Sequence, residues 1–145
     1  MEVAANLQVP DYATNRGGPA TLEWSNLYWA NRLAAGLSNF KIVALTISGE
    51  GTKGQFLPKL ANGMRLVTMQ DAKRGALDVT GSPTPTLIFV LSPCQDSHYK
   101  DAMAIGEKYN APVIALNAPF SRNYDVGGGK PFTLAYVMKR IPKGW

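Results

Sequence analysis

Two short apolar runs, residues 87–91 and Val113–Leu116, constrain the fold more than any other feature of the chain. Strands buried on both faces read as continuous hydrophobic runs of this kind, which is typical of parallel sheets covered by helices. The segment between the runs repeats apolar and small residues at helical spacing, namely Tyr99, Ala102, Met103, Gly106 and Tyr109. Residues 86–119 are therefore predicted to form a βαβ unit.

The ends of this helix carry recognisable signals. Ser92 is expected to cap it, with Pro93 at the first helical position and Gln95 completing a capping box. Asn110 precedes Pro112 and is a suitable left-handed residue to end the helix.

The rest of the chain is placed around this unit. A helix is predicted over residues 21–37, followed by strands at residues 40–48 and 64–69 and a last strand at residues 132–140. The buried stripe of the first helix is expected to consist of Leu22, Trp29, Leu33 and Leu37. This order predicts an α/β fold, a three-layer Rossmann-like domain with a mainly parallel sheet of about five strands. Residues 1–20 are expected to form an extended N-terminal arm, and residues 21–145 a single domain.

Composition narrows the classes of function. The one cysteine, Cys94, excludes a disulfide framework and any cysteine-based metal site. No apolar run approaches the roughly 18 residues that span a bilayer, so no transmembrane segment is expected. The net charge of +5 is concentrated toward the C-terminus, at Arg122, Lys130, Lys139, Arg140 and Lys143. Such a basic end suits anionic lipid, nucleic acid or an acidic protein face, or else only keeps the surface soluble.

A glycine-rich segment follows the first predicted strand. Gly49, Gly51 and Gly54 form a G-x-G-x-x-G string, and Asp71 follows about 20 residues on. In dinucleotide-binding proteins such glycines approach a pyrophosphate and the acid binds a ribose hydroxyl. Glu50 would repel a phosphate, however, and Pro58 shortens the helix behind the loop. A tight turn leaving a strand is the competing interpretation, and it is favoured.

The remaining chemistry-bearing residues are few. His98 is a candidate ligand for chlorophyll magnesium or another metal, although a lone surface histidine is the simpler interpretation. Cys94 is expected to be buried as a small apolar residue. The chain contains no G-x-S-x-G, Walker or H-E-x-x-H motif, so no catalytic residues are assigned and no enzyme activity is expected.

Two aromatic residues lie off the expected stripe of the first helix. Trp24 and Tyr28 either contact a partner or pack beneath the N-terminal arm.

Several stretches carry a resemblance to a known family. The strings APVIALNAP, FTLAYVMKRIPKGW, LEWSNLYWANRLAAGL and FKIVALTIS resemble a plastid and cyanobacterial domain of unknown function. That domain occurs in Low Photosystem II Accumulation proteins and in the C-terminal extension of chloroplast adenylate kinases. The resemblance covers residues 20–145, but this chain has SGEGTKG where the family commonly has Pro-Asp after the first strand. It implies a chloroplast location, a role in building or maintaining photosystems, and no agreed catalytic residues.

These observations together favour a non-catalytic accessory or assembly protein. It would bind a photosystem or light-harvesting protein on the stromal side of the thylakoid membrane and attach peripherally to that surface. The expected partner-binding residues are Trp24, Tyr28, Arg122, Lys130, Lys139, Arg140 and Lys143. No cofactor is expected, with chlorophyll at His98 or a nucleotide as the alternatives. The alternative function is a nucleotide-binding Rossmann-type enzyme that uses the loop from Gly49 to Gly54; nucleic-acid binding is not expected.

Overall fold

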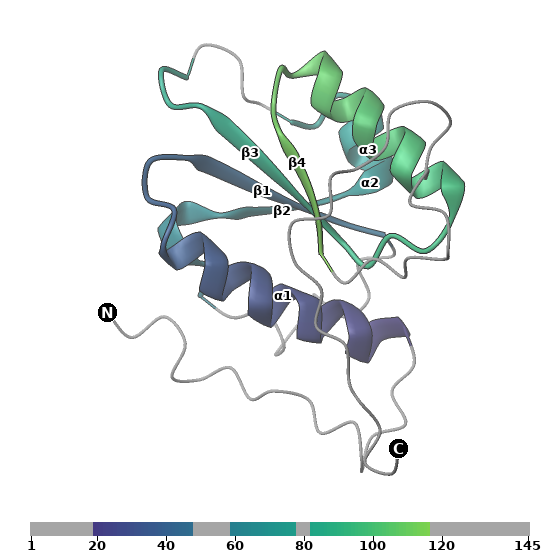
Figure 1. Ribbon diagram of the computed structural model, residues 1–145, viewed down its shortest axis with the longest axis horizontal. Helices are drawn as coiled ribbons and strands as arrows, with labels where there is room; N and C mark the ends of the chain where they lie inside the picture. The colour runs from purple at the N-terminus through teal and green to yellow at the C-terminus, as the bar shows by residue number, and fades with distance from the viewer. Residues whose placement is uncertain (1–18, 48–58, 78–81, 117–145) are drawn as a thin grey trace, which may run out of the picture.

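A computed structural model of the chain describes residues 19–47, 59–77 and 82–116, with side chains from Asn26 onward (Figure 1). Within these ranges four parallel strands form one sheet in the order β2-β1-β3-β4. The elements in chain order are α1 (Pro19–Ala35), β1 (Lys41–Thr46), a 3-10 turn η3 (Ala61–Gly63), β2 (Arg65–Thr68), α2 (Met69–Lys73), β3 (Thr86–Leu91), α3 (Asp96–Lys108) and β4 (Val113–Leu116). The described part of the chain is therefore an α/β fold.

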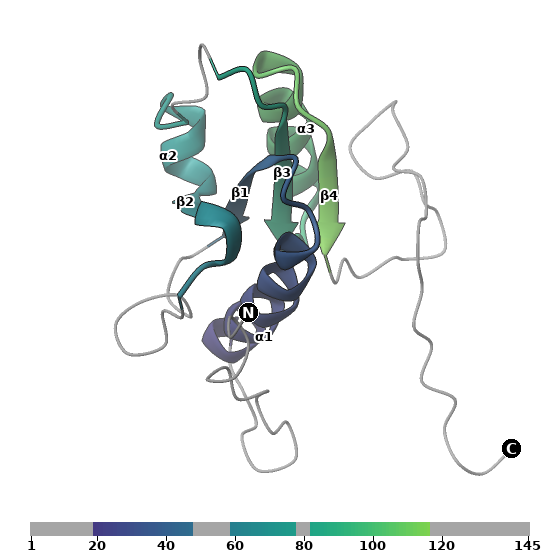
Figure 2. The ribbon, with the colours of Figure 1, turned by 90° about the vertical axis from the view of Figure 1, so that its left-hand side faces the viewer.

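The helices cover both faces of the sheet, with α1 on one face and α2 and α3 on the other (Figures 1 and 2). The strand registers align Ala44 with Phe89 and Phe89 with Ile114, so these three residues form a row across one face. Because successive side chains in a strand alternate between faces, each central strand contributes to both cores.

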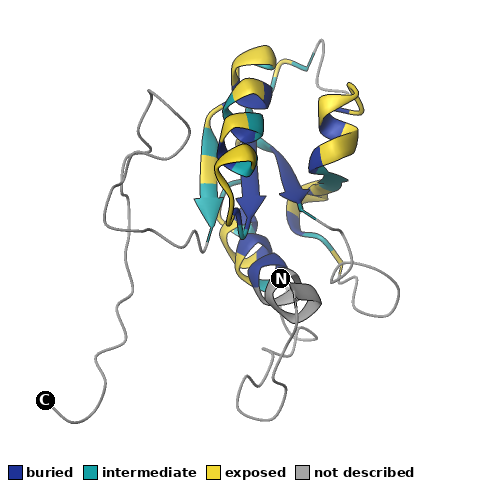
Figure 3. Cartoon of the chain, turned by 90° about the vertical axis from the view of Figure 1, so that its right-hand side faces the viewer, coloured by how far each residue is buried: buried dark blue, intermediate teal, exposed yellow. Residues whose placement is uncertain are grey.

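Each face has its own apolar core, and the central strands are buried on both sides (Figure 3). The core under α1 contains Leu27, Ala30, Ala34, Ile42, Ala44, Ala61, Met64, Leu87, Phe89 and Leu91. The core under α2 and α3 contains Val43, Leu45, Met69, Ala72, Leu77, Ile88, Val90, Ala102, Ile105 and Ala111. Burial on both faces explains why β1 and β3 are continuous hydrophobic runs in the sequence.

The predicted βαβ unit is confirmed as β3, α3 and β4. Asn110 ends the helix with a φ of 48°, as its position predicted. Gly106 is buried where α3 crosses β4, and a Cβ at this position would lie 2.5 Å from Cγ2 of Val113. The helix packs so closely on β4 because Gly106 has no side chain.

The predicted start of α3 is wrong. The helix begins at Asp96, and Gln95 is its N-cap without a side-chain hydrogen bond. Ser92 has a φ of 51°, and its hydroxyl instead accepts a hydrogen bond from the Asn26 side chain of α1. An N-cap residue needs an extended backbone, so the left-handed conformation of Ser92 and its contact with α1 exclude the predicted capping role.

The predicted buried stripe of α1 is also wrong at two positions. Trp29 is 51% exposed and Leu33 is 47% exposed, whereas Leu27, Ala30 and Ala34 are buried. The two alanines allow the helix backbone to approach the sheet closely, and an indole in the same place would hold it away. The helix packs on the sheet through Leu27 and the two alanines, and it leaves Trp29 and Leu33 half exposed.

Other boundaries differ less from the predictions. The helix α1 begins at Pro19, so residues 19 and 20 belong to it and not to an arm. The predicted strand at residues 64–69 is β2, although Met69 is not part of it and instead opens α2. The predicted arm over residues 1–18 and the predicted strand over residues 132–140 lie outside the described residues. None of the described helices has both the length and the apolar character needed to cross a membrane.

Candidate functional site

The carboxyl edge of the sheet is where open parallel α/β sheets bind ligands. The chain runs from β1 to β2 on one side and then crosses to β3 on the other, so β1 and β3 diverge at a topological switch point. Thr46 ends β1 at this edge, and Ser92 follows the end of β3. The polar residues around these two strand ends are therefore the first candidates for a site.

Two buried polar side chains lie on or against these strands. Thr46 is 2% exposed, and Asn26 of α1 is 3% exposed. The Asn26 amide donates a hydrogen bond to the Ser92 hydroxyl and thereby connects α1 to the end of β3. A buried amide with a partner stabilises the packing of α1, so a structural role accounts for Asn26.

Cys94 and His98 bring a thiol and an imidazole together at this edge. The Cys94 thiol sulfur lies 3.8 Å from Nδ1 of His98, and the Cys94 backbone N–H donates to the same nitrogen at 3.3 Å. Nδ1 of His98 is thus the acceptor of the bond from the Cys94 backbone. Cys94 is exposed, so the prediction of a buried apolar cysteine is wrong. It lies in the loop before α3, where no core reaches it.

Tyr99 lies beneath this pair. Its hydroxyl donates a 2.9 Å hydrogen bond to the carbonyl oxygen of Pro93. Burial raises the pKa of Tyr99 above its ordinary value of 10.0, and electrostatic interactions with Cys94 and Asp96 raise it further. Tyr99 thus stays protonated and secures the loop between β3 and α3.

The predicted nucleotide-binding residues are only partly described. Asp71 lies in the first turn of α2, directly after β2, at the carboxyl edge. Its carboxylate accepts a 2.7 Å hydrogen bond from the Thr68 hydroxyl, which in turn accepts one from the Asp71 backbone N–H. This reciprocal pair is a helix cap and occupies the acid. The loop containing Gly49, Gly51 and Gly54 lies outside the described residues.

The structure gives His98 few metal ligands within the described residues. No group of three or more His, Cys, Asp or Glu side chains converges there on a common point. Asp101, one turn along α3, forms a 2.9 Å salt bridge with Lys73 of α2. His98 therefore has Cys94 as its described neighbour, and the pigment or metal interpretation gains no support from geometry.

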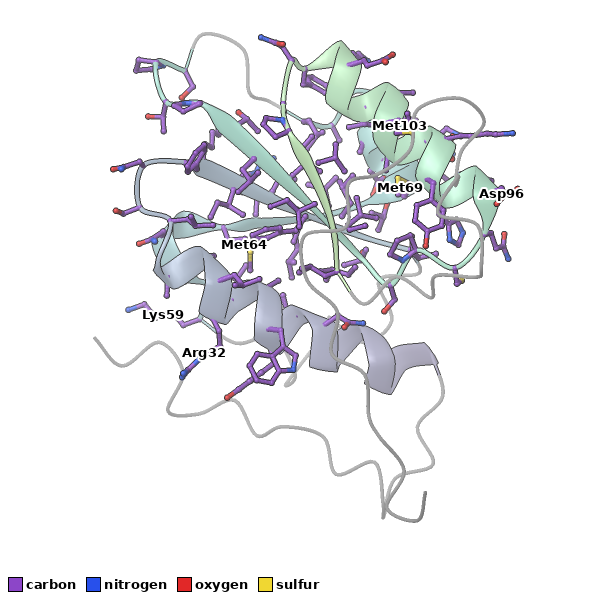
Figure 4. The ribbon with its side chains drawn as sticks, viewed as in Figure 1. Arg32, Lys59, Met64, Met69, Asp96 and Met103 are labelled. Carbon is purple, nitrogen blue, oxygen red and sulfur yellow. The ribbon has the colours of Figure 1, made fainter. Side chains whose placement is uncertain are left out.

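A second candidate surface lies on the solvent side of α1. We define the α1 outer face as Trp29, Arg32 and Leu33 of that helix, together with Lys59. The side chains of Arg32 and Lys59 extend outward near the C-terminal end of α1 (Figure 4). The carbonyl oxygen of Lys59 accepts a hydrogen bond from the Asn31 side chain of that helix. The face thus combines exposed apolar groups with two cations.

Tyr28 borders the α1 outer face. It is half-buried, and its ring meets that of Trp29 edge to face, with centroids 5.1 Å apart. The side chain of Trp24 and the cations Arg122, Lys130, Lys139, Arg140 and Lys143 lie outside the described part. Sequence reasoning missed Trp29 and Leu33, although the four-residue spacing of Ala30 and Ala34 could have identified the buried stripe.

Comparison with known proteins does not assign the chain to a family. No protein-family model, curated protein or solved structure matches it.

Proposed function

We propose that this protein is a non-catalytic accessory or assembly factor that binds a photosystem or light-harvesting protein. The observation that carries this proposal is that Trp29 and Leu33 are about half exposed one helical turn apart, while Leu27, Ala30 and Ala34 of the same helix fill the core. Tryptophan and arginine are enriched among residues that dominate binding energy at protein interfaces. The α1 outer face supplies both, from a rigid helix.

The charge of this face selects the kind of partner. Arg32 and Lys59 are both exposed, and no carboxylate among the described side chains belongs to α1. The partner surface is expected to offer an apolar pocket bordered by acidic groups, because complementary charge steers association and fixes orientation. The basic residues Lys139, Arg140 and Lys143 would strengthen the same attraction.

The proposed setting is the stromal side of the thylakoid in a chloroplast. It is supported by the resemblance of residues 20–145 to the domain found in Low Photosystem II Accumulation proteins. The proposal also takes the expected Rossmann-like three-layer domain of about five strands as the scaffold, with residues 132–140 as the fifth strand. In this fold, α1 presents its outer face at one side of a stable body.

Co-sedimentation at low ionic strength tests the proposal. The purified protein is incubated with thylakoid membranes, with photosystem particles in detergent, and with protein-free vesicles that contain anionic lipid. Binding to the particles, weakened by added salt, supports a protein partner. Binding to the vesicles alone identifies a lipid surface instead, and absence of binding in all three contradicts the function.

A nucleotide-binding enzyme is the second candidate, and the sheet order favours it. The G-x-G-x-x-G string follows β1 in the sequence, β1 ends at the switch point, and Asp71 follows β2 at the same edge of the sheet. The bond from Thr68 to Asp71 counts against it, because that acid is already paired. Calorimetric titration with NAD(H), NADP(H), ATP and AMP decides the matter. Heat that disappears in Asp71→Asn supports this function, and no heat at millimolar ligand excludes it.

A further inference from the structure

The outer edge of β4 is incomplete in the described part of the chain. There β4 pairs only with β3, through bonds such as Ile88 N–H to the Pro112 carbonyl and Ser92 N–H to the Leu116 carbonyl. In a parallel ladder alternate residues bond to opposite neighbours, so the N–H groups of Val113 and Ala115 point to the open edge. An uncovered edge of this kind is a template for another strand.

An apolar side chain of β4 is also left uncovered by the described residues. Ile114 is 39% exposed, and its register with Phe89 places it on the α1 face of the sheet. The opposite edge strand, β2, contributes no large exposed hydrophobic residue, since Leu66 and Val67 are packed against the two cores. A hollow of about 450 Å³ also opens beside the start of β4, between Gly106, Pro112 and Val113. The exposed apolar surface of the sheet is therefore at β4.

We infer that residues 132–140 of this same chain occupy the β4 edge as an antiparallel fifth strand. Residues 117–131 connect the two and can reach about 50 Å, far more than a neighbouring strand requires. They contain Pro119, Pro131 and three consecutive glycines, a composition that does not provide the helical crossover that a parallel strand would need.

The alternation of side-chain size assigns the faces of this strand. Phe132, Leu134, Tyr136 and Met138 are large and alternate with Thr133, Ala135 and Val137, which are small. The large side chains face the α1 side, where Ile114 is uncovered, and the small ones face the α3 side. This assignment requires the even-numbered residues to lie beside Ile114.

The antiparallel direction has a consequence for charge. The strand runs toward the amino edge of the sheet, so Lys139, Arg140 and Lys143 emerge there. The C-terminal end of α1 lies at this edge, because Asn62, which precedes β2, donates to the Ala34 carbonyl at 2.6 Å. The basic end of the chain is thereby attached to the same end of the body as Arg32. This inference concerns the isolated protein and does not depend on the docking function.

Disulfide scanning in the full-length chain tests the inference. In a Cys94→Ser background, Ile114→Cys is combined with a single cysteine at each position from 132 to 139. In this arrangement residue 114 and the residue opposite it in the fifth strand form a non-hydrogen-bonded pair. The two Cα atoms of such a pair are about 4.5 Å apart, a distance that suits a disulfide. Cysteines at even positions are expected to cross-link within one chain at least about tenfold faster than those at odd positions. Leu66→Cys on β2, with the same panel, is the matched control and is expected to stay reduced.

Three results of this scan would overturn the inference. They are faster cross-linking at odd positions, cross-linking to β2, and disulfides only between chains, which would make a second copy the occupant. Hydrogen exchange of the unmodified protein provides an independent reading. Protected amides at both Val113 and Ala115 support the fifth strand, and rapid exchange at both contradicts it even if engineered variants do not fold.

Discussion

The helices α1 and α3 pack on opposite faces of one sheet but present different surfaces to solvent. On the side of α2 and α3, acidic and basic residues are interspersed, namely Asp71, Lys73, Arg74, Asp96, Lys100, Asp101, Glu107 and Lys108. The α1 outer face instead exposes Trp29 and Leu33 beside two cations. A mixed, balanced surface keeps a protein soluble, whereas exposed aromatic and aliphatic groups beside charge of one sign suit recognition. The difference indicates which side of the molecule is available for a partner.

The largest expected effect on stability is the loss of a buried leucine of α1, compared with the loss of an exposed leucine of the same helix. Leu27→Ala is expected to lower the free energy of unfolding by about 2–5 kcal/mol, because it empties a fully buried site. Leu33→Ala should cost less than about 1 kcal/mol, because Leu33 is half exposed. Urea unfolding of both variants measures the difference. Equal losses would mean that Leu33 is covered in solution and that the α1 outer face is not free.

The packing of α3 provides a second comparison, between two glycines. Gly106→Ala is expected to destabilise the protein by about 1–3 kcal/mol, since the new methyl group would clash with Val113 and with the carbonyl oxygen of Ala111. Gly36→Ala at the end of α1 is the control, because its Cβ would meet only ordinary contacts. Its stability should change by less than about 0.5 kcal/mol. A neutral Gly106→Ala would show that α3 packs less closely on β4 than described.

Tyr99 makes the stability of the α3 side sensitive to alkaline pH. Its raised pKa means that the tyrosine of the unfolded chain loses its proton first as the pH rises, so the stability it contributes is complete below pH 10 and declines above it. Tyr99→Phe should cost about 1 kcal/mol at neutral pH through loss of the bond to Pro93. It should also show a shallower loss of stability above pH 10. Urea unfolding of both proteins over a range of pH measures the difference. The account is refuted if the free energy of unfolding falls with the same slope above pH 10 in both.

The smallest effect is expected at the salt bridge between Lys73 and Asp101. Both side chains are partly exposed, so a double-mutant cycle with alanine should give a coupling of less than about 1 kcal/mol. Added salt should weaken it further. A larger, salt-independent coupling would show that the α2–α3 side is held by its charges and is not simply a solvated surface.

The sequence predicted the parts of the fold that depend on local patterns. Unbroken apolar runs identified β3 and β4, and Asn110 marked the end of α3, because burial on both faces and left-handed stops leave direct signals. The outward position of Trp29 was not predicted, since hydrophobicity alone favours burying the largest residues. Which face of α1 packs depends on how closely the backbone approaches the sheet, and Ala30 and Ala34 determine that.

The candidate sites depended still more on tertiary contacts. The role of Ser92 as a cap was excluded by a bond from Asn26, a residue distant in the chain. The pairing of Asp71 with Thr68 was a short-range signal that could have been recognised, because a threonine three residues before an acid commonly caps a helix. Contacts between distant segments leave no such signal in a single sequence.

Association of matched double variants with photosystem particles tests the central claim most directly. Trp29→Ala/Leu33→Ala removes the apolar part of the α1 outer face. Lys100→Ala/Ala104→Ser changes two exposed positions one turn apart on α3. We predict that the α1 variant binds roughly tenfold or more weakly than the unmodified protein, with unchanged folding, while the α3 variant binds normally. Normal binding by the α1 variant, or an equal loss in both, would contradict the claim that α1 carries the docking surface.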